Sequence, residues 1–376
     1  MKPLRILSIS DIHFGNTHID PFQLADNFRR YVIAQLDSID LLLVGGDFFD
    51  TALALSDIIT PSILTIMYDL LATANKYNVT VRFVRGTFSH ERTQCQYFQL
   101  LHSQQNYTND LKYFDTITLD YLEQFDLRIL FLPDDLPYTN SAAIIAVVNQ
   151  KLRELNWDYV DYAVVHGYFD HVVPVGAHQP KNTYLRSQFD FVTRYVLIGH
   201  VHTSTIVDKF IYNGSFDRLA HGEEEPKGFI RIDDDGIVAH VKFITNNNAT
   251  KFITLDYSTI TDEVDVMQKL TTVIEQLTPK QTSHIRLIHP NISFRHGVLK
   301  FVHQTYPHIH ISLKAPNTKN AAIADATSKV VDFLTLVKPT EHLLPTLILD
   351  HGETASKPLS VTEERIRLLL QLDQAE

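Results

Sequence analysis

Four short clusters of acidic residues and histidines stand out in this chain, because each follows a strongly apolar, β-branched run. Such runs predict buried strands, so each cluster should lie where a strand ends and a loop begins. Carboxylates and imidazoles gathered at strand ends are the ligands that a pair of divalent metal ions needs. The four clusters are Asp11-Ile12-His13, Gly46-Asp47, His166-Gly167 and Gly199-His200-Val201-His202.

Such a constellation suits the hydrolysis of a phosphate ester, which needs an activated water and neutralised phosphoryl oxygens. Two metal ions about 3.5–4 Å apart supply both. Asp47 follows a buried strand and two glycines, so it is the natural candidate for a carboxylate that both ions share. Asp11 and His13 lie on the same side of their loop and suit one ion. The nitrogen ligands at the other strand ends would be His166, His200 and His202.

The elements that must position these residues are predicted by the spacing of the apolar residues. Strands alternate with helices up to the last cluster, which is typical of a layered α/β sheet. The predicted strands are 4–10, 39–44, 79–84, 127–132, 160–165 and 195–198, and the predicted helices are 22–36, 57–77 and 140–155. After His202 the pattern changes to consecutive strands at about 205–212, 227–232 and 237–244.

A polar run at 245–250 is the clearest break in the chain and predicts a domain boundary, so we expect a first domain over 1–250. Alternating helices and strands then predict a small α+β domain over 251–335. Its elements are predicted at 262–277, 284–288, 294–305 and 308–314. A tail over 336–376 ends in an amphipathic helix, which we expect to bind a partner through Ile366, Leu369 and Leu370.

Composition limits the class of protein. The 376 residues are 44% hydrophobic and 20% charged, as in an ordinary folded protein. No run approaches the ~20 apolar residues of a membrane span, and the N-terminus leads into a strand with no signal-peptide pattern. The single cysteine, Cys95, excludes an internal disulfide and predicts a reducing cytoplasm. The net charge of −11 argues against a protein that coats nucleic acid by bulk charge.

The clusters, in this order, resemble the calcineurin-like metallophosphoesterase family. Its pattern is D-x-H, G-D-x-x-D/H, G-N-H-D/E, a lone His and G-H-x-H. The resemblance implies a four-layer α-β-β-α sandwich with a small α+β cap domain and a C-terminal helical tail. The ligands that it implies are Asp11, His13 and His202 for one ion, His166 and His200 for the other, and Asp47 bridging the two.

The third motif departs from the family, because Gly86-Thr87-Phe88-Ser89-His90-Glu91 stands in place of G-N-H-D/E. His90 is retained, and the resemblance implies that it contacts the phosphate and helps to protonate the leaving group. The metal-binding Asn is missing. Ser89 could offer its hydroxyl, or Thr87 could do so instead. Either is a weaker ligand than an amide oxygen, so we predict looser occupancy of the second metal position.

A second signature resembles the nuclease subunit of double-strand-break repair complexes, the SbcD type. Asn213-Gly214-Ser215-Phe216-Asp217-Arg218 leads through Gly222-Glu223-Glu224 to Lys227-Gly228-Phe229. This resemblance implies a Mn²⁺-dependent exonuclease and endonuclease that acts on DNA ends, in the cytoplasm, or in the host cytoplasm if a phage encodes it. It also implies an SbcC-type ATPase partner with a coiled coil. Whether two copies pair as a homodimer stays open.

Two other functions stay open at this point. The chain could be a phosphoesterase that acts on small nucleotide or phosphoprotein substrates. It could also be a non-catalytic, DNA-binding regulator of the ATPase, which only the altered loop before His90 favours. The acidic net charge predicts that the isolated chain binds DNA poorly and that its partner improves the binding.

Several further residues have two interpretations. Arg218 and Lys227 could contact DNA, or they could hold a hairpin by pairing with the glutamates between them. Asp50 could support the metal site or cap the helix that follows. His308 and His310 alternate with isoleucines, which predicts the exposed face of a half-buried strand and no chemical role.

Overall fold

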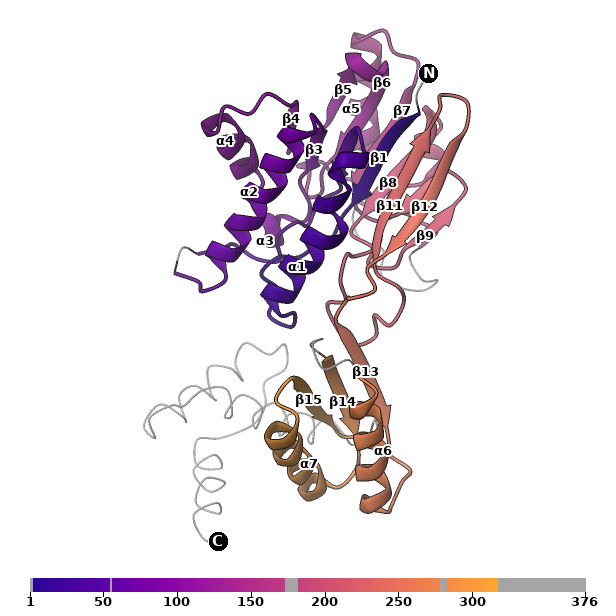
Figure 1. The fold of residues 1–376 in the computed structure, drawn as a ribbon. Helices are drawn as coiled ribbons and strands as arrows, with labels where there is room; N and C mark the ends of the chain where they lie inside the picture. The colour runs from indigo at the N-terminus through magenta and orange to yellow at the C-terminus, as the bar shows by residue number, and fades with distance from the viewer. Residues whose placement is uncertain (1–2, 55, 173–181, 278–282, 317–376) are drawn as a thin grey trace, which may run out of the picture. The chain divides into compact units, whose positions relative to one another are not determined.

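The computed structural model describes residues 3–54, 56–172, 182–277 and 283–316. The chain divides into two compact units (Figure 1). The first comprises the described residues up to Ile253 with Leu277, Ser283, His284 and His308–His310. The sequence predicts a boundary after residue 250. The second comprises Thr254–Gln276, Ile285–Pro307 and the described residues from Ile311. The predicted tail at 336–376 lies outside the described residues.

The first unit contains two six-stranded sheets. The strands of one sheet, in chain order, are β1 (Leu4–Ile9), β2 (Leu41–Val44), β3 (Thr80–Val84), β4 (Leu111–Phe114), β11 (Gly228–Asp234) and β12 (Ala239–Thr245). Those of the other are β5 (Thr118–Leu122), β6 (Leu127–Leu132), β7 (Val160–His166), β8 (Val192–Gly199), β9 (Thr205–Val207) and β10 (Phe210–Tyr212). Their spatial orders are β12-β11-β1-β2-β3-β4 and β5-β6-β7-β8-β10-β9.

Helices cover the outer faces of the two sheets. They are α1 (Pro21–Tyr31), α2 (Thr60–Lys76), α3 (Phe88–Glu91), α4 (Gln96–Gln104) and α5 (Ser141–Glu154), with 3₁₀ turns η1 (Ile33–Ser38), η2 (Glu123–Phe125) and η3 (Arg186–Phe189). Figure 1 shows α1, α2 and α4 beside the strands β1 to β4, and α5 beside β5 and β6. Helix α1 begins where the Asp20 carboxylate accepts hydrogen bonds from the backbone N–H of Phe22 and Gln23.

The strand residues alternate between two cores. Leu42 and Val44 pack with the helices of the outer layer, whereas Leu41 and Leu43 belong to the core that both sheets line. All four side chains are buried, and each such side chain contributes about 1.5–3 kcal/mol to folding. Helices, sheet, sheet and helices therefore form four layers, which confirms the predicted α-β-β-α sandwich.

Parallel pairing brings the predicted clusters to common edges. In the first sheet β1, β2, β3 and β4 are parallel neighbours, and in the second β6, β7, β8 and β10 are. The carboxyl ends of parallel strands meet at one edge of a sheet. Pairing continues into the loops, because the N–H of Asp11 donates to Gly46 O at 3.0 Å and that of His13 to Asp47 O at 3.0 Å. The first two clusters are therefore fixed side by side.

Two predicted elements are wrong in detail. The predicted strand 205–212 is a hairpin, in which β9 and β10 pair antiparallel across a turn where Asp208 has φ 54°. The predicted helix 22–36 is α-helical only to Tyr31, because Val32 leaves the helix with φ −105° and a 3₁₀ turn follows. Neither break has a glycine or proline to mark it in the sequence.

The small domain has a three-stranded sheet in the order β13-β14-β15, whose strands are Lys251–Asp256, Ser283–Ile288 and Ile309–Lys314. Two helices accompany it, α6 (Glu263–Glu275) and α7 (Ile292–Thr305). In β15, Ile309 and Ile311 are buried while His310 is exposed, which confirms the predicted alternation.

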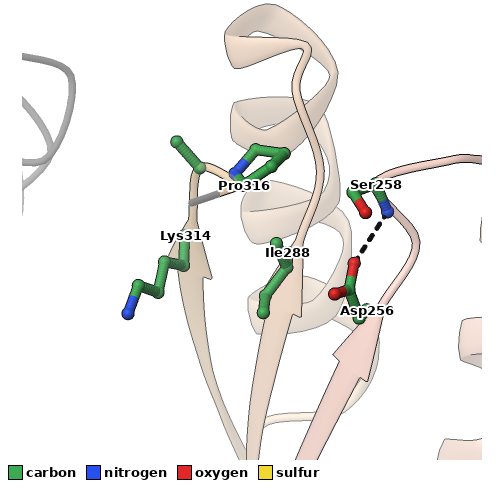
Figure 2. Close-up of a pocket in the computed structure, with 6 residues that line it drawn as sticks. Asp256, Ser258, Ile288, Lys314 and Pro316 are labelled. Carbon is green, nitrogen blue, oxygen red and sulfur yellow. Dashed lines mark hydrogen bonds between the residues drawn. The ribbon is translucent and has the colours of Figure 1, made fainter. Parts of the chain in front are cut away.

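A cavity of about 260 Å³ lies at one end of this small sheet (Figure 2). Beside it, the Ser258 N–H donates to the Asp256 carboxylate at 3.0 Å. Its lining residues are Asp256, Ser258, Ile288, Lys314, Ala315 and Pro316. Among the described residues, no helix is long and apolar enough to cross a membrane.

Candidate metal centre

The structure gathers the six predicted ligands into two groups of three. In each group the nitrogen and oxygen atoms that could bind an ion lie within 4.8 Å of one another. The first group is Asp11, His13 and His202, and the second is Asp47, His166 and His200. Asp47 Oδ2 lies 3.3 Å from His166 Nε2 and 3.8 Å from His13 Nε2, so one carboxylate faces both groups. That these residues bind ions stays a prediction, but their grouping is the one that the family resemblance implies.

The backbone is strained at the centre itself. Asp11, His13, Asp47 and His200 have φ values of 51°, 57°, 50° and 83°. Residues other than glycine rarely adopt positive φ, and each such residue costs about 1–3 kcal/mol. Strain of this kind persists where the surrounding structure imposes it, and it is concentrated at functional sites.

Glycine is required at the turn before Asp47. Gly46 has φ +91°, and a Cβ there would lie 2.4 Å from His166 Nδ1. At Gly86 a Cβ would lie 2.2 Å from the backbone nitrogen of Asp47. The loops at the ends of β2, β3 and β7 therefore pack directly on one another, and this close packing brings Asp47 to His166.

His13 is oriented by a carboxylate from the neighbouring loop. Its Nδ1 donates to Asp50 Oδ1 at 3.0 Å, and Asn16 Nδ2 donates to the same oxygen at 3.0 Å. Burial would raise the pKa of Asp50, but these two hydrogen bonds outweigh it and lower the pKa. Asp50 therefore has the supporting role, which is the first of its two predicted interpretations.

The opposite nitrogen of the same ring provides a test of whether a metal ion fits. His13 Nε2 is buried, faces Asp47, and has no hydrogen-bond partner within the described part of the chain. A buried nitrogen without a partner is costly, and an ion between it and a carboxylate removes that cost. Imidazole nitrogens combined with carboxylate oxygens suit Mn, Fe and Zn ions alike. The residues present therefore fit divalent metal ions.

His202 is held by a residue that the sequence did not single out for this role. Its Nδ1 donates to Glu223 Oε1 at 2.9 Å, and its Nε2 lies 4.0 Å from Asp11 Oδ1. Burial would raise the pKa of Glu223, but His202 and Lys227 outweigh it and lower that pKa to about 2. A carboxylate behind a ligand histidine fixes its tautomer and makes the ring more basic.

Lys227 and Arg218 brace the segment that carries Glu223. Lys227 is 1% exposed, and its Nζ pairs with Glu223 and Glu225 and donates to the carbonyl of His202 at 2.9 Å. Arg218 donates to the carbonyls of Thr250 and Glu225, each at 3.1 Å. The buried ammonium group of Lys227 therefore favours the structural interpretation over the DNA contact. For Arg218 the contacts likewise favour the structural role.

The structure places Thr87, and not Ser89, at the second group. Thr87 Oγ1 lies 3.2 Å from Asp47 Oδ2, 3.3 Å from His200 Nδ1 and 3.5 Å from His166 Nε2. Ser89 is exposed on α3. The short helix turns Ser89 outward, so Thr87 is the residue that stands where the family has its Asn.

His90 lies at the edge of the first group. Its Nδ1 donates to the backbone carbonyl of Asp50 at 2.8 Å, and its ring meets His13 edge to face at 5.1 Å. His13, Asp50 and His90 also form a third group whose nitrogen and oxygen atoms approach one another. Because Asp50 Oδ1 already accepts from His13 and Asn16, we interpret this group as support for the centre.

Glu91 ties two of the loops together. The residue is fully buried, and its carboxylate accepts hydrogen bonds from the N–H groups of Gly86, at 2.7 Å, and Phe48. Burial raises its pKa, and the charge of Asp47 adds to the effect. In the sequence, the only sign of this role was that Glu91 occupies the acidic position at the end of the third motif.

Asp47 and His166 stabilise each other's charged forms. Burial alone would raise the pKa of Asp47 and lower that of His166, but the attraction between them outweighs both effects. The pKa of Asp47 therefore lies below its usual range and that of His166 above it. Burial, with the charge of His166 beside it, lowers the pKa of His200 to about 4. His166 Nδ1 donates to Gly45 O at 2.7 Å, which leaves Nε2 facing Asp47.

Two further residues at the second group were missed from the sequence. Asp134 Oδ2 lies 3.9 Å from His200 Nδ1, and the ring of Tyr168 meets that of His200 edge to face at 4.3 Å. Both follow strand ends, β6 and β7, as the predicted ligands do. The position of Asp134 after an apolar run was therefore a usable signal.

Comparison with known proteins identifies the family. A model of the calcineurin-like phosphoesterase family matches residues 4–204, which include every predicted metal ligand. No curated protein matches the chain. Among solved structures, the chain is similar to TT1561 of Thermus thermophilus, with 11% identity, a TM-score of 0.37, and coverage of 64% of this chain and 99% of that one. A second structure shares 14% identity with a TM-score of 0.35, covering 65% and 100%. The chain belongs to the calcineurin-like phosphoesterase family, whose members are metal-dependent hydrolases of phosphoesters.

Proposed function

We propose that the chain is the nuclease subunit of an SbcD-type complex, a metal-dependent phosphodiesterase that cleaves DNA at ends beside an SbcC-type ATPase. The observation that carries the proposal is the segment from Asn213 to Phe229. Its sequence resembles that subunit, and its residues Glu223 and Lys227 hold His202 in the metal centre. The segment that resembles one branch of the family therefore also positions a predicted metal ligand, His202.

The proposed cofactor is a pair of divalent ions, with Mn²⁺ favoured by the resemblance. Asp11, His13 and His202 would hold one ion, His166 and His200 the other, and Asp47 would contact both. When bound, the ions would supply an activated water and neutralise charge on the phosphate. The side chains around the ions would transfer the proton and bind the substrate.

His90 is the proposed donor of the proton to the leaving oxygen. Because its Nδ1 donates to the carbonyl of Asp50, the free Nε2 can accept a proton and return it. The edge-to-face contact with His13 holds the imidazole beside the first group. A positioned imidazole of this kind contributes about 10²–10⁴-fold to a rate.

An aromatic surface next to His90 favours a nucleic-acid substrate. Phe88 begins the same short helix and is 48% exposed, and the guanidinium of Arg85 lies 6.0 Å from its ring centre. An exposed ring beside a phosphodiester site can stack a nucleobase, at about 1–3 kcal/mol per base. Arg85 would add positive charge for the backbone, on a chain whose net charge is −11.

The experiment is a nuclease assay on linear duplex and single-stranded DNA with added Mn²⁺, comparing the wild type with His90→Ala. We expect the wild type to cleave and the variant to lose about 10²-fold or more of the rate. Cleavage that persists in the variant would show that a group other than His90 donates the proton. A wild type that is inert even with the ATPase would favour the regulatory function.

A second comparison separates DNA from small substrates. Phe88→Ala should slow DNA cleavage while it leaves the hydrolysis of glycerophosphoethanolamine unchanged, because this phosphodiester has no ring to stack on Phe88. Tyr97→Ala is the matched control, since Tyr97 is a similarly exposed ring, 54%, on α4. Equal loss on both substrates would point to a phosphoesterase of small molecules.

A further inference from the structure

We propose that Asp134 supplies a carboxylate ligand to the second metal position, together with the hydroxyl of Thr87. The family pattern has an amide at this position, and this chain has none. The inference rests on the metal-dependent hydrolysis proposed above and deepens it. It concerns which residues of this chain complete the position of His166 and His200.

The topology brings Asp134 to the correct edge. Strand β6 runs parallel to β7, with Leu132 opposite Val165, so the loop after β6 emerges next to His166 at the end of β7. Strand β8 is the next parallel neighbour and leads to His200. Asp134 therefore follows the same rule as the predicted ligands, since it lies just beyond a buried parallel strand.

The loop of Asp134 is fixed to the loop of Thr87 by its backbone. Arg85 Nη2 donates to the Asp134 carbonyl at 2.7 Å, and the Asp134 N–H donates to the Arg85 carbonyl at 3.3 Å. Arg85 lies two residues before Thr87 in the chain. These two bonds place the hydroxyl and the carboxylate against the same imidazole, that of His200.

The distances between these atoms fit ligands of one shared ion. Two ligands of one ion with bonds of about 2.1 Å lie about 3 to 4 Å apart. His200 Nδ1 lies 3.2 Å from His166 Nε2, 3.3 Å from Thr87 Oγ1 and 3.9 Å from Asp134 Oδ2. The last distance is too long for a hydrogen bond. An ion bound by His166 Nε2, His200 Nδ1 and Thr87 Oγ1 would lie beside the imidazole that the Asp134 carboxylate faces, within reach of a turn of that side chain.

The carboxylate of Asp134 has no competing cation. Its side chain is 21% exposed, and within the described part of the chain no lysine or arginine forms an ion pair with it. The guanidinium of Arg85 binds the backbone carbonyl of Asp134 and leaves the carboxylate facing His200. A largely enclosed carboxylate without a cation is costly, so a metal ion is the partner that the position lacks.

The test is the titration of the full-length chain with Mn²⁺ alone, followed by calorimetry and by the electron paramagnetic resonance of free Mn²⁺. The wild type should bind two ions. Asp134→Asn keeps the shape of the side chain and removes its charge, so it should weaken the second binding step by about 10-fold or more and leave the first unchanged. Asp134→Glu keeps the charge and should retain both steps. Thermal melting of each variant shows that it is folded.

Asp170→Asn is the control, because it removes a carboxylate from the loop after β7 without entering either group. It should bind like the wild type. Two unchanged steps in Asp134→Asn, or fewer than two ions in the wild type, would overturn the assignment.

The outcomes separate this inference from the proposed function. A wild type that binds two ions, with the second lost in Asp134→Asn, supports the ligand even if the chain cleaves no DNA. DNA cleavage with unchanged binding in Asp134→Asn would leave the function standing and remove the ligand.

Discussion

The two halves of the candidate metal centre differ in the groups that orient their histidines. In the half of Asp11, His13 and His202, the residues follow the family pattern, and carboxylates orient both histidines through Nδ1. In the half of His166 and His200, a neutral carbonyl orients His166, and a threonine hydroxyl replaces the amide. A carboxylate makes the ring behind it more basic than a carbonyl does. The comparison teaches that the first position should bind its ion more tightly.

Asp47 is the element that the two halves share, so its removal should have the largest effect. Asp47→Ala takes away the one carboxylate that faces both groups. We expect loss of the second ion, weaker binding of the first, and a fall in the hydrolysis rate on the order of 10³-fold, because several kcal/mol of charge stabilisation disappear. Metal content and rate, measured beside the surface variant Asp26→Ala, check this. A second ion retained in Asp47→Ala would mean that the halves are independent.

The first half depends on a bracing segment with a buried carboxyl, Asp217. This side chain accepts from the N–H of Thr250 and of Arg218, and burial raises its pKa to about 7, from 3.8. A folded-state pKa above the unfolded value stabilises the protein fully below about pH 4, and this stabilisation is lost as the pH rises through 7. Asp217→Asn should therefore remove a decline of up to about 4 kcal/mol in the free energy of unfolding between pH 4 and 8.

Chemical denaturation across that pH range measures the difference between the wild type and Asp217→Asn. The comparison of two chains cancels the titration of the histidines, which both share. Parallel curves for the two chains would show that Asp217 is ionised throughout, and that the segment bracing His202 has no pH dependence of its own.

The hydrogen bond from His202 Nδ1 to Glu223 is found only in the first half, so its removal should affect that half alone. Glu223→Gln keeps the length of the side chain but removes the charge that holds His202 Nδ1. We expect the first binding step to weaken about 10- to 100-fold, with the second step little changed. Titration with Mn²⁺ measures both steps. A loss confined to the second step would reverse our assignment of the halves.

The smallest expected effect separates Thr87 from Ser89. Thr87→Val keeps the shape and removes the hydroxyl at the second group, so we expect that step alone to weaken about 10-fold, the lower end for residues around a metal. Ser89→Ala removes an exposed hydroxyl two residues away and should change nothing. The same titration measures both variants. The opposite result would restore the interpretation in which Ser89 is the ligand.

The first half could be predicted almost entirely from the sequence, because apolar runs mark the strands and the residues after them are the chemical ones. The same rule gave Asp47, His166 and His200, and it predicted the four layers. It could not choose between Thr87 and Ser89, since that depends on how α3 turns its residues. It also missed Glu223 as the partner of His202, because 21 residues separate them and only the folded segment joins them.

The most direct test of the two-metal account is a crystal structure of the chain soaked in Mn²⁺, with anomalous scattering used to locate the ions. We predict two peaks about 3.5–4 Å apart on either side of Asp47. One should contact Asp11, His13 and His202. The other, at lower occupancy, should contact His166, His200, Thr87 and Asp134. A single peak, or two peaks of which neither contacts Asp47, would contradict the account.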